Sequence, residues 1–332
     1  MKNIFKLLSL ALVGSTLFVG CQKEEVGGIS FSFEDMNNPK SYIFGLDNNH
    51  LYNCWETGEK IYINGGTAKP VTVTNSNSTV SYVSNYTVDD NTPLYCFYGG
   101  YNHTGVSNAL DNYNPTSHKY VFNVRENMDY VTTTINNRPV QRIDAPTIGY
   151  ALYNANGRTR ICMKNIGSML QFNIKKGNGS NTILLKSIAV YSNNVLAGKM
   201  EVSVNETTTS TYSDYNSTST QLKYRKLNLT TPQTLTAAPQ TYYLPIRSLS
   251  NAKIQIVLEV DFNNTPFWIS SPVLTDKSIA RNTIMQLGTI AIQGEHGDGS
   301  SANGPTVFIN DNEQTGQAKW SHSKNNPNIN LN

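Results

Sequence analysis

The sequence predicts an all-β protein with two tandem β-sandwich domains, which follow an N-terminal signal peptide and precede a flexible tail. Three observations predict this class. Apolar and polar side chains alternate with a period of two in many short segments, β-branched and aromatic residues dominate those segments, and turn residues separate them every 8–12 positions or so. The chain has 332 residues, of which 38% are hydrophobic and 15% charged. This length is sufficient for two domains with cores of ordinary size.

The first twenty residues have the pattern of a signal peptide. Lys2 and Lys6 give a positive start, residues 4–20 are almost wholly apolar or small, and Cys21 follows. This order is typical of a secretory signal with a small residue before the cut site. A cysteine at the new N-terminus resembles a bacterial lipoprotein signal, although Phe18 stands where the usual motif has leucine. We therefore predict a lipoprotein signal peptide over residues 1–20, lipidation of Cys21 and a tether over residues 21–28.

Lipidation of Cys21 would determine how the protein is attached to a membrane. Each buried acyl CH₂ contributes about 0.8 kcal/mol, so several chains together make a stable anchor without a transmembrane helix. The cluster Lys23, Glu24 and Glu25 resembles the signal that sends lipoproteins of Bacteroidetes-type bacteria to the outer face of the outer membrane. Two simpler interpretations stay open: an ordinary secretory signal in which Cys21 has no role, and a charged tether that is merely solvated.

The N-terminal domain is predicted over residues 29–153. Its strand candidates either alternate apolar and polar residues or form short apolar runs bounded by turn signals such as Asn64-Gly65-Gly66. They are Ile29–Phe33, Lys60–Ile63, 71–74, 94–98 and 120–124.

The C-terminal domain is predicted over residues 154–293, after the polar connector 153–157. Its strand candidates are 160–163, 169–174, 183–191, 241–244, 252–260 and 284–292. From residue 294 to residue 332 we predict a flexible tail, because this part is rich in Gly, Ser, Asp and Asn. It contains one candidate strand, the apolar run Val307, Phe308 and Ile309.

Past Cys21 the chain has three cysteines, Cys54, Cys96 and Cys162. Three cysteines cannot all pair within one chain, and their spacing offers no metal knuckle. We expect buried thiols that act as small apolar side chains. The alternative is a disulfide between Cys54 and Cys96.

Charge and motifs argue against nucleic-acid binding and catalysis. The net charge is +3 and no run of Lys and Arg exceeds two residues, so there is no electrostatic footprint for nucleic acid. The five histidines stand in polar segments, and no nucleophile elbow, zinc-protease motif or phosphate loop is present. Glu295, His296 and Asp298 are expected in a solvated tail. We predict a non-enzymatic protein with no catalytic residues, no cofactor and no metal site.

Six motifs in order carry a resemblance to a known family. They are Trp55-Glu-Thr-Gly58-Glu59-Lys60-Ile61, the aromatic run 94–98, the stretch 148–172 through mid-chain, Val195-Leu-Ala-Gly198, Tyr242-Tyr-Leu-Pro245 and Arg281-Asn282-Thr283-Ile284. Together, over residues 29–292, the chain resembles the fimbrillin family, the two-domain lipoprotein pilins and pilus accessory subunits of Bacteroidetes. Each motif also has a structural explanation: Trp55 as a core anchor, Gly58 in a turn with positive φ, Pro245 at a strand end or edge and Asn282 as a backbone cap.

The resemblance implies transthyretin-like domains that polymerise by strand exchange. A protease would remove the N-terminal strand with Ile29, Phe31 and Phe33, and an extended strand of another subunit would fill the groove. The run Val307, Phe308 and Ile309 is the candidate donor. The implied partners are other fimbrial subunits, in a homo- or heteropolymer, the outer membrane through the lipid, and a host or bacterial surface ligand.

The trimming site departs from the family pattern. The family's best-known pilins are cut after an arginine in the first inter-strand loop, but no arginine occurs here between Cys21 and Arg125, and Lys40 and Lys60 are the lysines nearest that loop. Either the protease differs or the subunit stays untrimmed and acts as an anchor or cap.

A surface glycan-binding lipoprotein that stays anchored and monomeric is the alternative. The chain has 19 tyrosines and three tryptophans, of which Trp268 is expected in the core and Trp320 on the surface.

Overall fold

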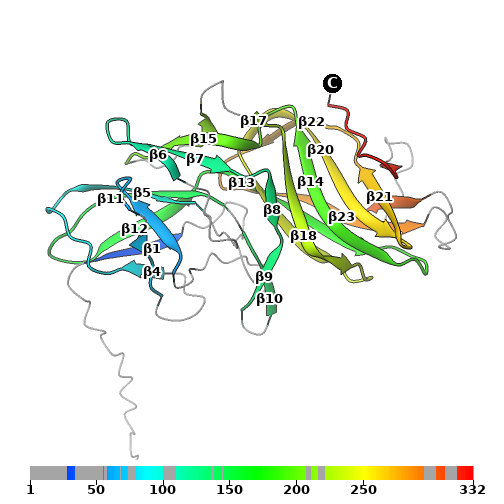
Figure 1. The fold of residues 1–332 in the computed structure, drawn as a ribbon, viewed down its shortest axis with the longest axis horizontal. Coiled ribbons are helices and arrows are strands. Elements are labelled where there is room, and N and C mark those ends of the chain that lie inside the picture. Colours follow the sequence, from blue (N-terminus) through cyan, green and yellow to red (C-terminus); the bar gives the residue numbers. More distant parts are fainter. Residues whose placement is uncertain are drawn as a thin grey trace, which may run out of the picture.

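The fold is described from a computed structural model, shown in Figure 1. The structure describes residues 28–33, 55, 58–67, 69–73, 80–99, 110–135, 138–143, 145–206, 211–215, 221–294, 304–310 and 320–331. Strands, turns and irregular segments account for all of these residues, so the predicted all-β class is confirmed. Within these ranges no helix is present that is long and apolar enough to cross a membrane.

Many strands agree with the period-two pattern, because buried apolar residues alternate along them with more exposed residues. In chain order they are β1 (Ile29–Phe33), β2 (Lys60–Ile63), β3 (Lys69–Pro70), β4 (Val80–Val83), β5 (Pro93–Tyr98), β6 (Leu110–Asn114), β7 (Lys119–Val124), β8 (Asn127–Asp129), β9 (Val131–Ile135), β10 (Arg138–Arg142), β11 (Thr147–Leu152), β12 (Thr159–Asn165), β13 (Ser168–Lys176), β14 (Ile183–Ser192), β15 (Ala197–Ser203), β16 (Ser213–Asp214), β17 (Gln221–Leu222), β18 (Tyr224–Thr234), β19 (Gln240–Ile246), β20 (Leu249–Phe262), β21 (Thr265–Ser270), β22 (Leu274–Ile279), β23 (Ile284–Gly294), β24 (Pro305–Ile309) and β25 (Ser321–Ser323).

A seven-stranded sheet with the order β3-β2-β5-β11-β12-β1-β4 organises the N-terminal part. Its two faces bury different clusters, as β5 illustrates. Leu94, Cys96 and Tyr98 belong to the cluster around Trp55, whereas Phe97 faces a second cluster with Tyr120 and others. Burial on both faces explains why the sequence of β5 is a nearly continuous apolar run.

A five-stranded sheet covers the second of these faces. Its order is β16-β15-β7-β6, and β17 also pairs with β15. Phe122 of β7 and Met200 of β15 pack in this sheet against Phe97 and Ile148 of the first sheet. The N-terminal sandwich therefore includes β15, which follows the mid-chain connector by about forty residues.

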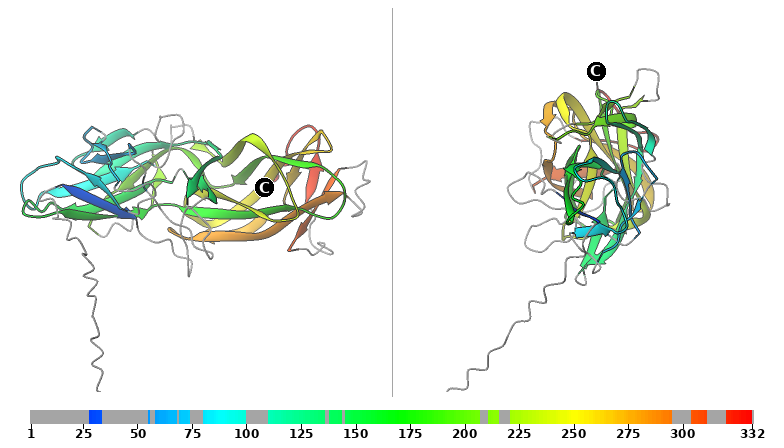
Figure 2. Two further views of the ribbon diagram at one scale, coloured as in Figure 1. Left: turned by 90° about the horizontal axis from the view of Figure 1, so that it is seen from below. Right: turned by 90° about the vertical axis from the view of Figure 1, so that its left-hand side faces the viewer.

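The C-terminal part consists of a four-stranded sheet, β19-β13-β23-β24, and a larger sheet, β25-β21-β20-β14-β18-β8, in which β22 also pairs with β20. The largest buried cluster lies between them. Figure 2 shows the early strands at one end of an elongated molecule and the late strands at the other. A two-stranded sheet of β9 and β10 completes the fold.

Strand pairings cross the predicted division at residue 153 in both directions. β12 follows that residue but pairs with β11 and β1, and β15 pairs with β7. In the other direction, β8 pairs in parallel with β18, and Met128 joins the C-terminal cluster. The division into domains 29–153 and 154–293 stays a prediction, but the two parts exchange strands.

The described residues of the region predicted as a flexible tail with one strand form two strands. β24 pairs with β23 in antiparallel register, and β25 pairs with β21. Beyond β25 the backbone of Asn328 and Asn330 bonds the Gln255 side chain on the outer face of β20. In the part of the tail that the structure describes, hydrogen bonds thus hold the chain against the C-terminal sheets.

Candidate functional site

The candidate site is the place that β1 occupies in the first sheet. β1 pairs in parallel with β12 on one side and antiparallel with β4 on the other. Ile29 and Phe31 are buried, and Phe33 is half-buried. Because these side chains alternate along the strand, all three face the cluster around Trp55, as the sequence predicts.

Aromatic rings line the site that β1 occupies. The Phe33 ring stacks on Trp55 at 4.4 Å between centroids with an interplanar angle of 17°. Tyr98 meets Trp55 at 4.9 Å in a tilted arrangement, and Phe31 meets it at 6.3 Å. Trp55 is fully buried, which agrees with its expected role as a core anchor.

An ion pair between Glu59 and Arg142 lies next to Tyr98 of the Trp55 cluster. Glu59 accepts a hydrogen bond from the Tyr98 hydroxyl at 2.9 Å, and its carboxylate lies 3.0 Å from an Arg142 guanidinium nitrogen. The side chains of Glu59 and Arg142 retain only 10% and 8% exposure. Gly58, which directly precedes Glu59, has a φ of 92°, the conformation expected of a glycine at this turn.

The candidate donor strand lies at the other end of the molecule. Within the described residues β24 is the end strand of its sheet, and it pairs only along its β23 side. Val307 is buried in the C-terminal cluster, while Phe308 and Ile309 are half-buried. The structure therefore places the candidate donor and β1 in different sheets of one chain.

The cysteines differ from one another. Cys96 is buried, and no described residue forms a disulfide with it. Burial raises the pKa of its thiol well above the ordinary value. Cys162 is exposed, which corrects the expectation that it is a buried thiol. It lies between Ile161 and Met163, which take the inward positions of β12.

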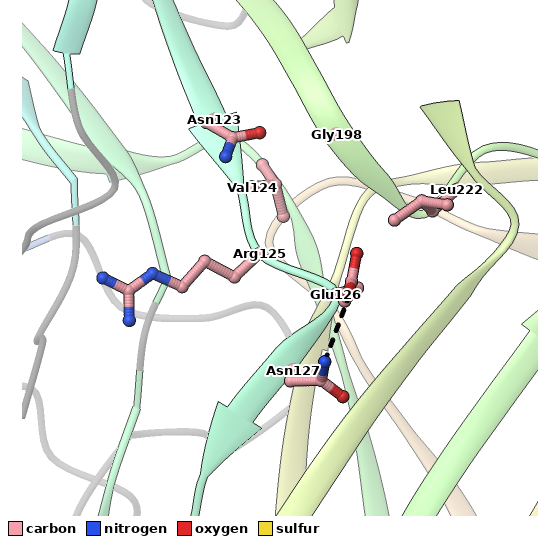
Figure 3. A pocket seen from close by; sticks show the side chains of 7 residues that line it. All are labelled: Asn123, Val124, Arg125, Glu126, Asn127, Gly198 and Leu222. Atoms are coloured by element: carbon pink, nitrogen blue, oxygen red, sulfur yellow. Dashed lines mark hydrogen bonds between the residues drawn. The ribbon is translucent and has the colours of Figure 1, made fainter. Parts of the chain in front are cut away.

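A pocket that the sequence did not reveal lies where the chain passes from β7 to β8. It has a volume of about 370 Å³ and is open to solvent. Figure 3 shows Glu126 between Val124 and Leu222, with Asn127 donating to its carboxylate at 3.3 Å, while Arg125 extends the other way. These are ordinary residues of a connection, so no sequence signal marks them. The pocket offers one carboxylate and two side-chain amides to a small polar molecule.

Partly buried aromatic side chains also gather beside the second cluster of the N-terminal sandwich. Tyr95 stacks on His118 at 3.7 Å and meets Tyr150 at 5.4 Å, and the Tyr150 hydroxyl donates to Glu206 at 3.4 Å. Tyr113 completes the group, with its hydroxyl 3.2 Å from His118 Nδ1. Burial raises the pKa of Tyr113 to about 12.

Both tryptophans that bear on glycan binding depart from expectation. Trp268, expected in the core, is half-buried because its neighbours Phe267 and Ile269 take the inward positions of β21. Trp320, expected on the surface, is half-buried and packs against the C-terminal cluster.

Several predicted residues lie outside the described residues. They are Cys21, Lys23, Glu24, Glu25, Lys40, Cys54, Glu295, His296 and Asp298, together with the signal peptide, and their predictions stay open. Across the described residues no group of three His, Cys, Asp or Glu side chains could hold a metal ion.

Comparison with solved structures gives matches of low identity. A candidate cell adhesion protein from Bacteroides ovatus is 13% identical, covers 86% of this chain and 96% of its own, and has a TM-score of 0.40. One from Bacteroides fragilis is 11% identical, covers 87% of this chain and 97% of its own, and has a TM-score of 0.42. A fimbrial protein from Bacteroides ovatus is 12% identical, covers 78% of this chain and 48% of its own, and has a TM-score of 0.31. No protein-family model and no curated protein matches the chain.

Proposed function

We propose that this chain is a fimbrial subunit or a pilus-associated adhesin that assembles by strand exchange after β1 is removed. The position of β1 carries the proposal. It is short, lies between β12 and β4, and supplies Ile29, Phe31 and Phe33 to the core. Fully burying a side chain of this kind contributes about 1.5–3 kcal/mol. Loss of β1 would therefore leave an apolar groove and two unpaired strand edges, which an extended strand of another chain can complete.

β24 is the segment of this chain that we propose as the donor to another subunit. Its position at the end of a sheet means that only the pairing with β23 must break for it to leave. Donation from β24 to the β1 place of the next subunit joins two different surfaces. Such a contact is heterologous, so it builds an open filament and not a closed ring.

We propose that the chain reaches the cell surface as a lipoprotein. The signal-like residues 1–20, Cys21 and the cluster Lys23, Glu24 and Glu25 support export to the outer membrane with an N-terminal lipid. The partners would be other fimbrial subunits, the outer membrane through that lipid, and a surface ligand of a host or a bacterium. The proposed role involves no catalysis, cofactor, metal ion or nucleic acid.

The test is the N-terminus of the protein isolated from the native cell surface. Mass spectrometry is expected to find a free N-terminus beyond Phe33, and an unheated denaturing gel is expected to show a ladder that heating collapses. Lys40→Ala should block trimming if the protease cuts after a basic residue of segment 34–54, whereas Lys69→Ala in β3 should leave trimming unchanged. An acylated Cys21 with a single monomer band would overturn assembly by strand exchange.

A glycan-binding surface lipoprotein is the second candidate. The group of Tyr95, Tyr113, His118 and Tyr150 favours it, because half-exposed rings with hydroxyl and carboxylate neighbours combine an apolar face with hydrogen-bonding groups. This function predicts an acylated monomer that does not co-purify with fimbriae. It also predicts that Tyr150→Ala reduces retention on immobilised glycans, whereas Tyr215→Ala at the β15–β16 edge does not.

A further inference from the structure

We infer that the groove around β1 is built to recognise a strand with a hydroxyl or amide side chain at the position that Phe31 occupies in this chain. The inference names the chemistry of the partner strand, and it rests on the proposed strand exchange for the existence of that partner.

The first observation concerns Ser81, which faces Phe31 across the β1–β4 pair. The two residues are directly opposite in the antiparallel register, so their side chains share one face of the sheet. Both are fully buried. Among the described residues, the Ser81 hydroxyl meets no hydrogen-bond partner. The benzyl group of Phe31 therefore lies against a polar atom that it cannot pair.

The second observation concerns Trp55, which lies in the same buried cluster as Phe31. Its indole nitrogen is buried, and it too meets no hydrogen-bond partner in the part of the chain that the structure describes. Phe31 lies 6.3 Å from the Trp55 ring, centroid to centroid. Two residues that neighbour Phe31 thus carry buried polar atoms without partners. Buried polar groups in native proteins are nearly always paired, so this coincidence calls for an explanation.

Two other polar groups near β1 are paired. The Ser30 hydroxyl donates to the Thr159 carbonyl at 3.4 Å, and the Tyr98 hydroxyl donates to Glu59 at 2.9 Å. The flanking positions remain apolar, because Ile29 lies opposite Val83 and Phe33 stacks on Trp55.

These contacts define the strand that fits best. It carries an apolar residue, then a hydroxyl or amide residue two positions on, then a second apolar residue. An amide or hydroxyl oxygen can accept from the Trp55 nitrogen, and the same side chain can donate to the Ser81 hydroxyl. One face of β24 carries Pro305, Val307 and Ile309, and the other carries Thr306 and Phe308. A second copy's β24 therefore offers a hydroxyl at the Phe31 position only in the register that places Thr306 there.

The test compares two side chains of the same shape at position 31 of the full mature chain. Phe31→Thr and Phe31→Val differ by a hydroxyl in place of a methyl group, and each is combined with Ser81 and with Ser81→Ala. Urea unfolding with Ser81 present is expected to give the threonine variant an unfolding constant about fivefold lower than that of the valine variant. With Ser81→Ala the advantage is expected to shrink or reverse. Equal threonine–valine differences in the two backgrounds, or a valine variant at least as stable with Ser81, would overturn the inference.

A second measurement keeps the inference testable if neither variant at position 31 folds. Ser81→Ala in the chain with Phe31 removes an unpaired buried hydroxyl, so its unfolding constant is expected to equal or fall below that of the unchanged chain. A clear rise would show that the hydroxyl already has a partner and would overturn the inference. Both measurements keep β1 in place. They can therefore fail while N-terminal trimming succeeds, and an acylated monomer would leave their outcome unaffected.

Discussion

At the scale of single residues, packing and charge explain why the motif around Trp55 has the residues it has. The buried Trp55 side chain packs against the residues of β1, Gly58 has a φ of 92°, and Glu59 forms an ion pair with Arg142. A carboxylate buried to this degree needs both a charged partner and a hydrogen bond. Arg142 and the Tyr98 hydroxyl supply them.

Removing Glu59 should therefore destabilise the protein strongly. Glu59→Ala leaves the Arg142 guanidinium buried without its carboxylate, and loss of one partner of a buried ion pair costs about 3–5 kcal/mol. Denaturant unfolding is the measurement. The double variant Glu59→Met with Arg142→Met is the control, and we expect it to be more stable than Glu59→Ala because no buried charge remains. A single variant as stable as the unchanged chain would contradict this account.

The face of the strand on which a residue lies decides whether its burial could be predicted from its type. Trp55, Ile29 and Phe31 are buried as their apolar character indicates. Cys162 and Trp268 are apolar too, but each stands between two inward-facing neighbours on its strand. Successive side chains of a strand point to opposite faces. A residue between two buried neighbours therefore faces outward even when its own side chain is apolar.

At the scale of elements, most predicted strands exist but their partners could not be read from the sequence. Alternation identifies the face of a strand and not its neighbour. The parallel pairing of β1 with β12 and the pairing of β15 with β7 join segments far apart in the chain. The three apolar residues of β1 were predicted at the candidate site, whereas the pocket beside Glu126 depends on the position of β15 and β17 and had no local signal.

Gln255 of β20 holds the part of the C-terminal segment that follows β25. Gln255 donates to the Asn328 carbonyl at 3.0 Å and accepts from the Asn330 amide at 2.9 Å. We expect Gln255→Leu to loosen residues 328–331, because each buried group that loses its partner costs about 1–3 kcal/mol. Hydrogen exchange of residues 328–331 should then accelerate about tenfold or more, while exchange in β14 stays unchanged. Gln286→Leu, at an exposed position of β23, is the matched control, and equal exchange in both variants would refute the role of Gln255.

At the scale of the whole molecule, the two sandwiches are joined by shared strands. The N-terminal sandwich needs β12 and β15, which follow residue 153, and the C-terminal sheet takes up β8, which precedes it. A chain organised in this way has no single cut that leaves both cores complete.

Separate halves should therefore fail to fold. We expect fragments 28–153 and 154–332 each to lack the cooperative thermal transition of the full chain, because each loses strands that bury part of its core. Circular dichroism on heating is the measurement, with the uncut chain 28–332 as the control. A sharp transition in either fragment near the temperature of the full chain would show that the halves are independent.

β1 and β12 are far apart in the sequence, and this separation affects the order in which the strands fold. Ser30 bonds a carbonyl 129 positions further along the chain, and closing so long a loop early is entropically unfavourable. β11 and β12 are close in sequence and can pair first, so we expect β1 to dock last. Pulse-labelled hydrogen exchange during refolding should show protection of residues 147–152 before residues 29–33. The species that precedes the native state would then be a body with the β1 place still open, which is the form that trimming would later restore.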